Sequence, residues 1–168
     1  MHLRSYALVR YMKEAFKMNI PFLNINDIQI MTNLVLALAL GGLIGYFREK
    51  ERKVAGLRTH ILVAMGSCLA MQISIYMAQL SPNGDPGRIA AGVVAGIGFL
   101  GGGAIIRSGA SVLGLTTAAL MWGAAMIGMA VGCNFYVGAI AATVLMLFAL
   151  QILREVEHKY IHNKDQND

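Results

Sequence analysis

Acidic residues are absent from residues 86–154 of this 168-residue chain, and between Asp85 and Leu153 the only bases are Arg88 and Arg107. Charged residues make up 14% of the chain and hydrophobic residues 57%, whereas a soluble domain carries about 25% charged residues. A soluble domain cannot keep so long an uncharged stretch in contact with water. The scarcity of charge therefore indicates a membrane protein.

Cysteine is also scarce. Cys68 and Cys133 lie in apolar surroundings without the spacing of metal ligands, so we expect free thiols. The sequence has no nucleophile elbow, no H-E-x-x-H motif and no pair of carboxylates within an apolar run, and we therefore expect neither an enzyme nor a cofactor. His158 and His162, four residues apart beside Glu155, are a candidate metal pair, although a solvated tail is the more common explanation of such spacing.

Five apolar runs of about 20 residues predict an all-α bundle of about five transmembrane helices, since about 20 residues cross the hydrocarbon core. They cover residues 28–47, 59–80, 88–106, 112–131 and 135–153. Short breaks make the last three runs antiparallel neighbours. Four spans are the alternative, if two runs fuse into one longer buried helix. The predicted organisation is a tail at 1–27, a membrane domain at 28–153 and a polar tail at 154–168.

Basic residues set the predicted orientation. They gather in the first and third connectors and the C-terminal tail, which places these segments, and the C-terminus, in the cytoplasm. The formal net charge is +5, but the basic residues are not interleaved with aromatic residues as they are on a surface that binds nucleic acid. The bilayer is therefore the expected partner. Residues 1–19 form either a basic amphipathic helix on the membrane surface or a disordered leader.

Glycine is abundant, most of all in residues 88–109, "RIAAGVVAGIGFLGGGAIIRSG". Within it "GIGFLG" matches the dinucleotide-binding pattern, but no acid follows about 20 residues later and no strand precedes it. Small residues allow close backbone contact between helices in a bilayer, which predicts close packing and makes residues 88–106 the expected central helix. The glycines assigned to helix packing are Gly92, Gly96, Gly98, Gly101, Gly102, Gly103, Gly128 and Gly132.

Polar residues at the ends of the runs suit capping. Thr59 is the expected N-cap of the second helix, Asp85 caps the third, and Gln72 is expected to bond a neighbouring helix. Because the later runs contain no carboxylate, a cation carrier would rely on backbone carbonyls near Gly101–Gly103, or on Glu49 and Asp85 at the mouths.

Three stretches together resemble the membrane domain of the MgtC/SapB family. They are "GLIGYFREKERKVAGLRTHILVAMGS" (42–67), "GDPGRIAAGVVAGIGFLGGGAII" (84–106) and "GLTTAALMWGAAMIGMAVG" (114–132). The resemblance implies a multi-pass protein of the bacterial inner membrane, linked to growth under low magnesium and, in some members, to virulence. It also implies a regulator that contacts other membrane proteins, such as F-type ATP synthase.

Several polar residues fall on motif positions of that family: Arg48, Glu49, Arg58, Thr59, Asp85, Arg88, Thr116, Thr117 and Trp122. Phe47 stands where the family often has an acid, and Gly92 where it often has glutamine, which weakens the case for a cation site. The sequence shows no counterpart of the soluble C-terminal domain of virulence-linked members, so a role that depends on that domain is not expected here.

Two functions follow as hypotheses. The first is a non-enzymatic membrane protein for adaptation to magnesium limitation, acting as a homo-oligomer or through contact with another membrane complex. The second is a transporter of Mg²⁺ or another cation, with Glu49 and Asp85 as candidate ligands. A lipid-facing scaffold without an ion role is a third.

Overall fold

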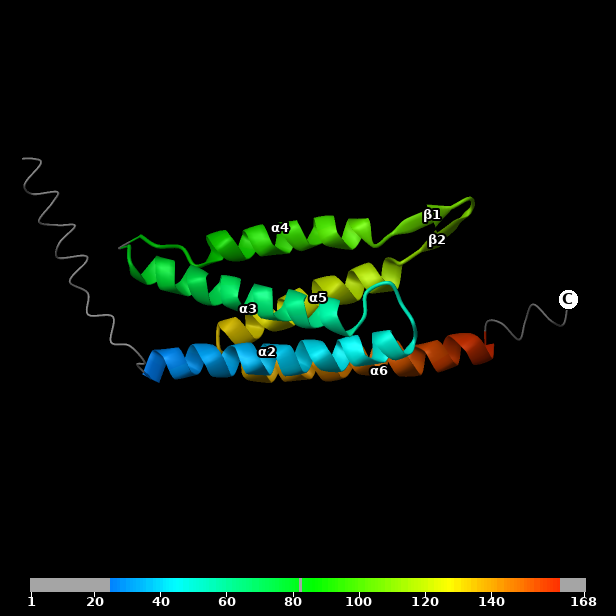
Figure 1. The fold of residues 1–168 in the computed structure, drawn as a ribbon, viewed down its shortest axis with the longest axis horizontal. Helices are drawn as coiled ribbons and strands as arrows, with labels where there is room; N and C mark the ends of the chain where they lie inside the picture. The colour runs from blue at the N-terminus through cyan, green and yellow to red at the C-terminus, as the bar shows by residue number, and fades with distance from the viewer. Residues whose placement is uncertain (1–24, 82, 161–168) are drawn as a thin grey trace, which may run out of the picture.

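A computed structural model describes residues 25–81 and 83–160 (Figure 1). The N-terminal tail up to residue 24 and His162 of the candidate metal pair lie outside the described residues. The elements are five helices and a two-stranded hairpin within the described part of the chain: α2 (Ile25–Lys50), α3 (Leu57–Gln79), α4 (Gly87–Gly103), β1 (Ile106–Ser108), β2 (Ser111–Leu113), α5 (Leu115–Gly132) and α6 (Tyr136–Tyr160).

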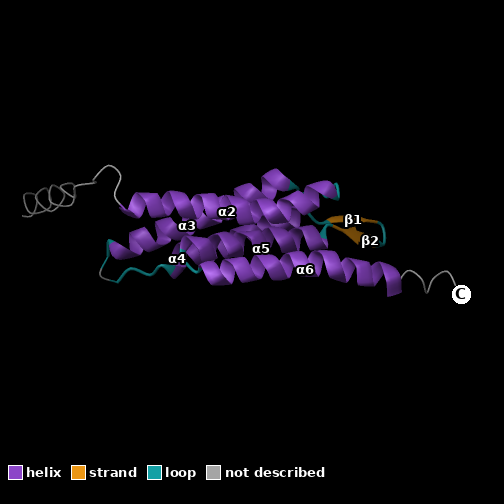
Figure 2. Cartoon of the chain, turned by 90° about the horizontal axis from the view of Figure 1, so that it is seen from below, coloured by secondary structure: helices purple, strands orange, loops and turns teal. Residues whose placement is uncertain are grey.

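The helices run up and down along one long axis, as Figures 1 and 2 show. One end of the bundle, here called the connector end, carries the α2–α3 connector, the hairpin and the C-terminal end of α6. The other end, the loop end, carries the start of α2 and the loops at 80–86 and 133–135. The five separate helices agree with the predicted all-α bundle, and no two of the predicted runs are fused into one helix.

The central element is α5, which packs against α2, α3, α4 and α6. Its glycines allow the closest approach. A Cβ added at Gly128 would overlap the backbone of Ala64, and one added at Gly132 would lie 2.6 Å from the carbonyl oxygen of Cys68. Such contact between backbones suits a bilayer, where apolar burial alone does not hold helices together.

The prediction that residues 88–106 form the central helix is wrong. Helix α4 packs on α3 and α5 from one side only, and its buried residues are Ala90, Ile97 and Gly101. Its other faces point outward. The abundance of glycine was correctly associated with helix contact in α5, but glycine content alone does not distinguish a helix enclosed by neighbours from one at the edge of a bundle.

The third connector is a β-hairpin rather than a tight turn between helices. Strands β1 and β2 pair antiparallel, with Ile106 opposite Leu113 and Ser108 opposite Ser111. The two-residue turn between them begins at Gly109, whose φ of +60° is the backbone that such turns require. The hairpin therefore ends α4 at Gly103 and delays α5 to Leu115, three residues inside the predicted limits on each side.

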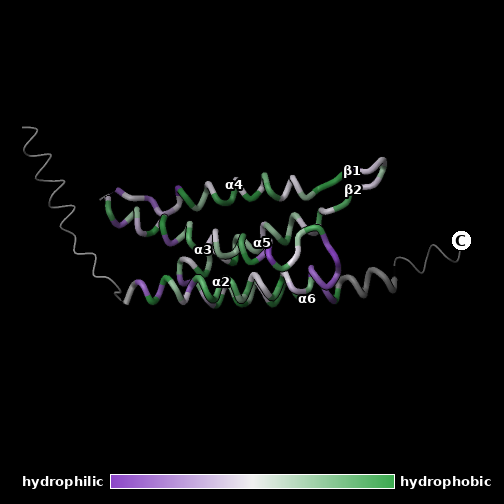
Figure 3. Tube along the Cα trace, in the orientation of Figure 1, coloured by the Kyte–Doolittle hydropathy of each residue, from purple (hydrophilic) through white to green (hydrophobic). Residues whose placement is uncertain are grey.

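Three helices are long and apolar enough to cross a bilayer, judged by length and composition: Asp27–Lys50, Leu57–Gln79 and Leu115–Gly132. Helix α4 and residues 136–152 of α6 are apolar but shorter. Large apolar side chains cover the outside, among them Phe99 at 84% and Val137 at 80% exposure. Figure 3 shows hydrophilic stretches in the connector and in the loop between α3 and α4. An apolar outer surface of this kind is suited to lipid.

Candidate functional site

A buried polar cluster ties three segments together at the connector end. The Arg48 side chain, 3% exposed on α2, donates a hydrogen bond of 2.9 Å to Oγ1 of Thr117 on α5. A second guanidinium nitrogen lies 3.1 Å from Oε2 of Glu51, with which it forms a salt bridge. A buried charge needs such partners to offset its lost hydration. Two motif residues predicted from sequence, Arg48 and Thr117, therefore meet in space.

Glu49 of α2 caps the start of α3, although it lies eight residues before Leu57 in the chain. Its Oε2 accepts a hydrogen bond of 3.0 Å from the N–H of Leu57, the first residue of α3. Gly56 is the N-cap, and a Cβ there would overlap the Glu49 carboxylate. The prediction that Thr59 is the N-cap is therefore wrong, because a carboxylate from α2 already meets the first N–H of the helix.

His60 lies deeper than its position near the start of α3 suggests. Its side chain is 0% exposed. Its Nδ1 lies 2.8 Å from the carbonyl oxygen of Gly56, and within the described part of the chain its Nε2 has no hydrogen-bond partner. The backbone oxygen of His60 lies so close to α2 that a Cβ added at Gly41 would be 2.7 Å from it.

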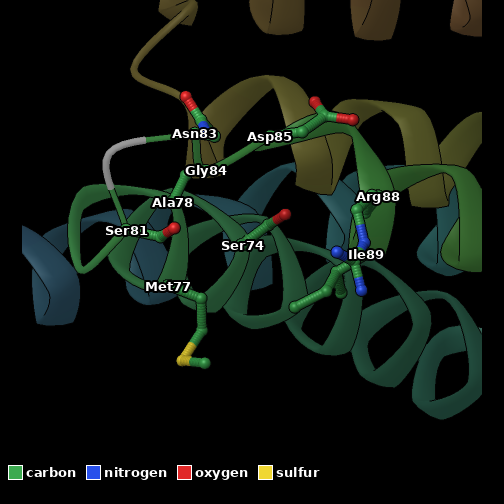
Figure 4. A pocket seen from close by; sticks show the side chains of 9 residues that line it. All are labelled: Ser74, Met77, Ala78, Ser81, Asn83, Gly84, Asp85, Arg88 and Ile89. Carbon is green, nitrogen blue, oxygen red and sulfur yellow. The ribbon is translucent and has the colours of Figure 1, made fainter.

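A pocket of about 270 Å³ lies at the loop end, between the end of α3 and the start of α4, with Asp85 and Arg88 in its lining (Figure 4). Oδ1 of Asp85 accepts a hydrogen bond of 2.7 Å from the N–H of Gly87, the first residue of α4, although the N-cap position itself is held by Pro86. Ser74 of α3 is buried and donates to the carbonyl oxygen of Pro86. In Figure 4 the charged groups of Asp85 and Arg88 turn away from each other, and no ion pair joins these two described residues.

The two candidate cation ligands do not form one site. Glu49 and Asp85 lie at opposite ends of α3, whose 23 residues span about 34 Å at 1.5 Å per residue. Each accepts a hydrogen bond from a helix N–H. Among the described residues, no three histidine, cysteine or acidic side chains lie together in a way that would hold a metal ion. This donor set does not fit a resident divalent cation held by protein carboxylates.

A second polar cluster, at the loop end, joins α2 to the turn before α6 and was not predicted. Asn33, 3% exposed, donates to Oδ1 of Asn134 at 2.9 Å, and the hydroxyl of Tyr136 lies 2.9 Å from both amide oxygens. Gln29 contacts all three side chains. The available signal was Asn134 itself, because an asparagine directly after a helix often takes the left-handed conformation, here with φ 63°.

Gln72 bonds a neighbouring helix, as predicted. Its Nε2 lies 3.5 Å from the carbonyl oxygen of Ile30 on α2. It also lines a small pocket of about 210 Å³ next to the loop-end cluster, together with Asn33 and Asn134. None of the residues that line this pocket is charged.

The predicted packing glycines divide into two groups. Gly128 and Gly132 lie against backbone, and a Cβ at Gly101 would meet that of Ala118 at 3.5 Å. The others face open space, with nothing within 4 Å of an added Cβ: Gly92, Gly96, Gly98, Gly102 and Gly103.

The remaining motif residues do not belong to either buried cluster. Arg58, Thr116 and Trp122 are exposed, whereas Thr59 is half-buried and lines a groove beside α4. Motif membership alone therefore does not separate the buried members from the surface ones.

The apolar bundle, with its polar clusters at the helix ends, defines the chain as a multi-pass helical membrane protein. The profile of the MgtC family matches residues 34–159. The chain belongs to the MgtC family.

Several relatives are similar over most of this chain. It is 46% identical over 127 residues to "Protein MgtC" of Salmonella typhimurium, covering 76% of this chain and 53% of the relative. It is 40% identical over 139 residues to "Putative magnesium transporter YhiD" of Escherichia coli strain K12, covering 80% and 65%. An "Uncharacterized protein" of Haemophilus influenzae is 39% identical over 150 residues, covering 85% and 63%.

The chain thus spans between about half and two thirds of the length of these relatives. No solved structure matches it.

Proposed function

We propose that this chain is a non-enzymatic regulator of the bacterial inner membrane that supports adaptation to low magnesium, acting through helix contacts with other membrane proteins. The name of one relative, a putative magnesium transporter, supports the link to magnesium. A contribution to virulence belongs to the same proposal and rests on the family resemblance alone.

The outward glycine face of α4 is the observation that carries the proposal. Gly92 and Gly96 are four residues apart, so they share a face of the helix. That face is opposite Ile97 and Gly101, which pack inside. Spacing of this kind lets a second helix approach closely in a bilayer. Gly128 and Gly132 of α5 already have such neighbours within the chain, whereas Gly92 and Gly96 of α4 would receive theirs from a partner.

The partner we propose is either a second copy of the chain or another membrane complex, for which the family resemblance suggests F-type ATP synthase. The two differ in what would accompany the purified protein. A second copy gives a homo-oligomer, and a complex gives additional subunits. Both would use the same face of α4.

Replacement of Gly96 by leucine tests this proposal. The added side chain enters open space in the single chain, so the fold is expected to survive while the partner is displaced. Gly66→Leu is the matched control, because Gly66 is also exposed with open space next to it, but on α3. We expect Gly96→Leu to abolish crosslinked oligomers or co-purified subunits from mild detergent, with Gly66→Leu unchanged. Equal recovery with both variants contradicts the proposal.

Cation transport is the second candidate, and two observations favour it. One relative is named a putative magnesium transporter, and Asp85 provides a carboxylate in the loop-end pocket. Mg²⁺ uptake into proteoliposomes of the purified protein discriminates between the candidates. Uptake that is lost in Asp85→Ala would show that the protein is a transporter and contradict the proposed regulator. Uptake equal to that of empty vesicles supports the regulator.

A further inference from the structure

An open groove lies at the connector end, between α4 and the segment that leads into α3. Its volume is about 570 Å³, within the range of about 300–1,000 Å³ typical of ligand sites. The lining is largely apolar, with one hydroxyl from Thr59, and includes Val54, Ala55, Phe99, Gly102 and Met121. A Cβ added at Gly102 would have no atom within 4 Å of it. The space next to Gly102 is therefore open.

Basic residues are concentrated in the two chain segments that border this groove. Residues 48–58 and 104–114 contain six bases and two acids. Both acids are engaged, Glu51 with Arg48 and Glu49 with the N–H of Leu57.

Three of the bases adjoin the groove lining in the chain. Lys53 precedes Val54, Arg58 precedes Thr59, and Arg107 follows Ala104 by three residues. All three side chains are exposed, and within the described part of the chain none of them is paired with a carboxylate. Long basic side chains on an apolar surface extend their charged groups toward the polar boundary of the bilayer.

The start of α3 does not supply the anion site. The first N–H groups of a helix carry partial positive charge, but the carboxylate of Glu49 already accepts from the N–H of Leu57. A phosphate at the same point would be repelled by that carboxylate. The side chains of Lys53 and Arg58 are therefore the groups left to hold an anion beside the groove.

We propose that the groove binds an anionic phospholipid. Its acyl chain lies against Phe99, Gly102 and Met121, and its phosphate is held by Lys53 and Arg58. Basic pockets at the ends of transmembrane helices have the chemistry to hold such headgroups. Charge complementarity selects an anionic lipid over a zwitterionic one, and the apolar lining selects a lipid over a soluble phosphate compound. This inference does not depend on the regulator proposed above.

The single tryptophan of the chain provides a local probe. Trp122 follows Met121 of the groove lining and is 45% exposed. Purified protein is reconstituted into phosphatidylcholine vesicles that contain increasing fractions of brominated phosphatidylglycerol or brominated phosphatidylcholine. Quenching of Trp122 fluorescence then gives the relative binding constant of the two lipids. We expect the anionic lipid to bind more tightly, and salt to weaken this preference.

Charge and groove are tested by separate variants. In Lys53→Gln/Arg58→Gln we expect the preference for the anionic lipid to fall by about fivefold for each charge removed. Lys50→Gln/Arg52→Gln is the matched control, because it removes two exposed charges at the same end from residues that do not line the groove. Its preference is expected to equal that of the unchanged protein.

Gly102→Leu fills the groove without altering charge, and we expect it to reduce quenching by the anionic lipid. Equal binding of the two lipids by the unchanged protein overturns the proposal. So does a preference that survives loss of both charges, or quenching that is unaffected in Gly102→Leu.

Discussion

Arg48 and Thr117, 69 residues apart in sequence, are joined by a hydrogen bond of 2.9 Å in the interior of the bundle. Each residue is 3% exposed. The bond links the end of α2 to the first turn of α5. Because the arginine also pairs with Glu51, the cluster fixes the connector against the central helix at one end of the molecule.

Thr117→Val is expected to destabilise the protein, because valine keeps the shape of threonine but leaves the buried guanidinium without this acceptor. Loss of one partner of a buried charged group costs about 1–3 kcal/mol. Thr116→Val is the control, since Thr116 is exposed on the adjacent position of α5. The measurement is the midpoint of thermal unfolding in detergent. Equal midpoints for the two variants would show that the bond contributes nothing.

Gly128→Ala is expected to lower the same unfolding midpoint. The added methyl group would overlap the backbone of Ala64, which cannot move without separating α3 from α5. Overpacking of this kind costs about 1–3 kcal/mol. Gly98→Ala places the same methyl group in open space on α4, where alanine favours the helix. A midpoint for Gly98→Ala below that of Gly128→Ala would contradict the packing described.

Tyr136→Phe tests the cluster at the loop end. Its hydroxyl lies within 2.9 Å of Asn33 and Asn134, and removing it leaves a buried amide short of one partner. We expect a loss of about 1 kcal/mol. Tyr46→Phe is the control, because Tyr46 is 57% exposed and keeps its edge-to-face contact with Phe47. The two substitutions remove the same atom, so an equal effect would place the cause outside the cluster.

Cysteine labelling of the unchanged protein tests the predicted orientation. Cys133 is exposed at the loop end, whereas Cys68 is buried. If the connector end faces the cytoplasm, a membrane-impermeant maleimide labels Cys133 in intact spheroplasts.

The controls for this labelling use both ends of the bundle. Cys133→Ser abolishes the labelling, and a cysteine introduced by Ala110→Cys in the hairpin of that variant reacts only after the membrane is opened. The reverse pattern would place the C-terminus outside.

Apolar runs and the charged connectors were sufficient to predict the helices and their order, because hydrocarbon thickness determines run length. The hydrogen bonds of Asp85 at the start of α4 and of Gln72 to a neighbouring helix were predictable, because each follows from the side chain and its position in a helix. The identity of the central helix was not predictable, because Gly96 and Gly128 both lie in apolar sequence, yet Gly96 faces open space and Gly128 faces the backbone of α3. The hydrogen bond between Arg48 and Thr117 depends on the packing of α2 against α5. That packing is a long-range contact, which the residues near either position do not reveal. The hairpin was missed because Gly109 at a turn is equally compatible with two helices.

The hairpin also leaves α4 with 17 residues, whereas α2 has 26. At 1.5 Å per residue these helices measure about 26 Å and about 39 Å. A bilayer core of about 30 Å is thicker than the first and thinner than the second. The apolar run of α2 at residues 28–47 matches this thickness, because the polar ends of the helix extend beyond it. Lipids next to α4 must instead compress, so the membrane is thinned at the flank that α4 forms. Proteins with similarly short helices would relieve this mismatch by gathering at that flank.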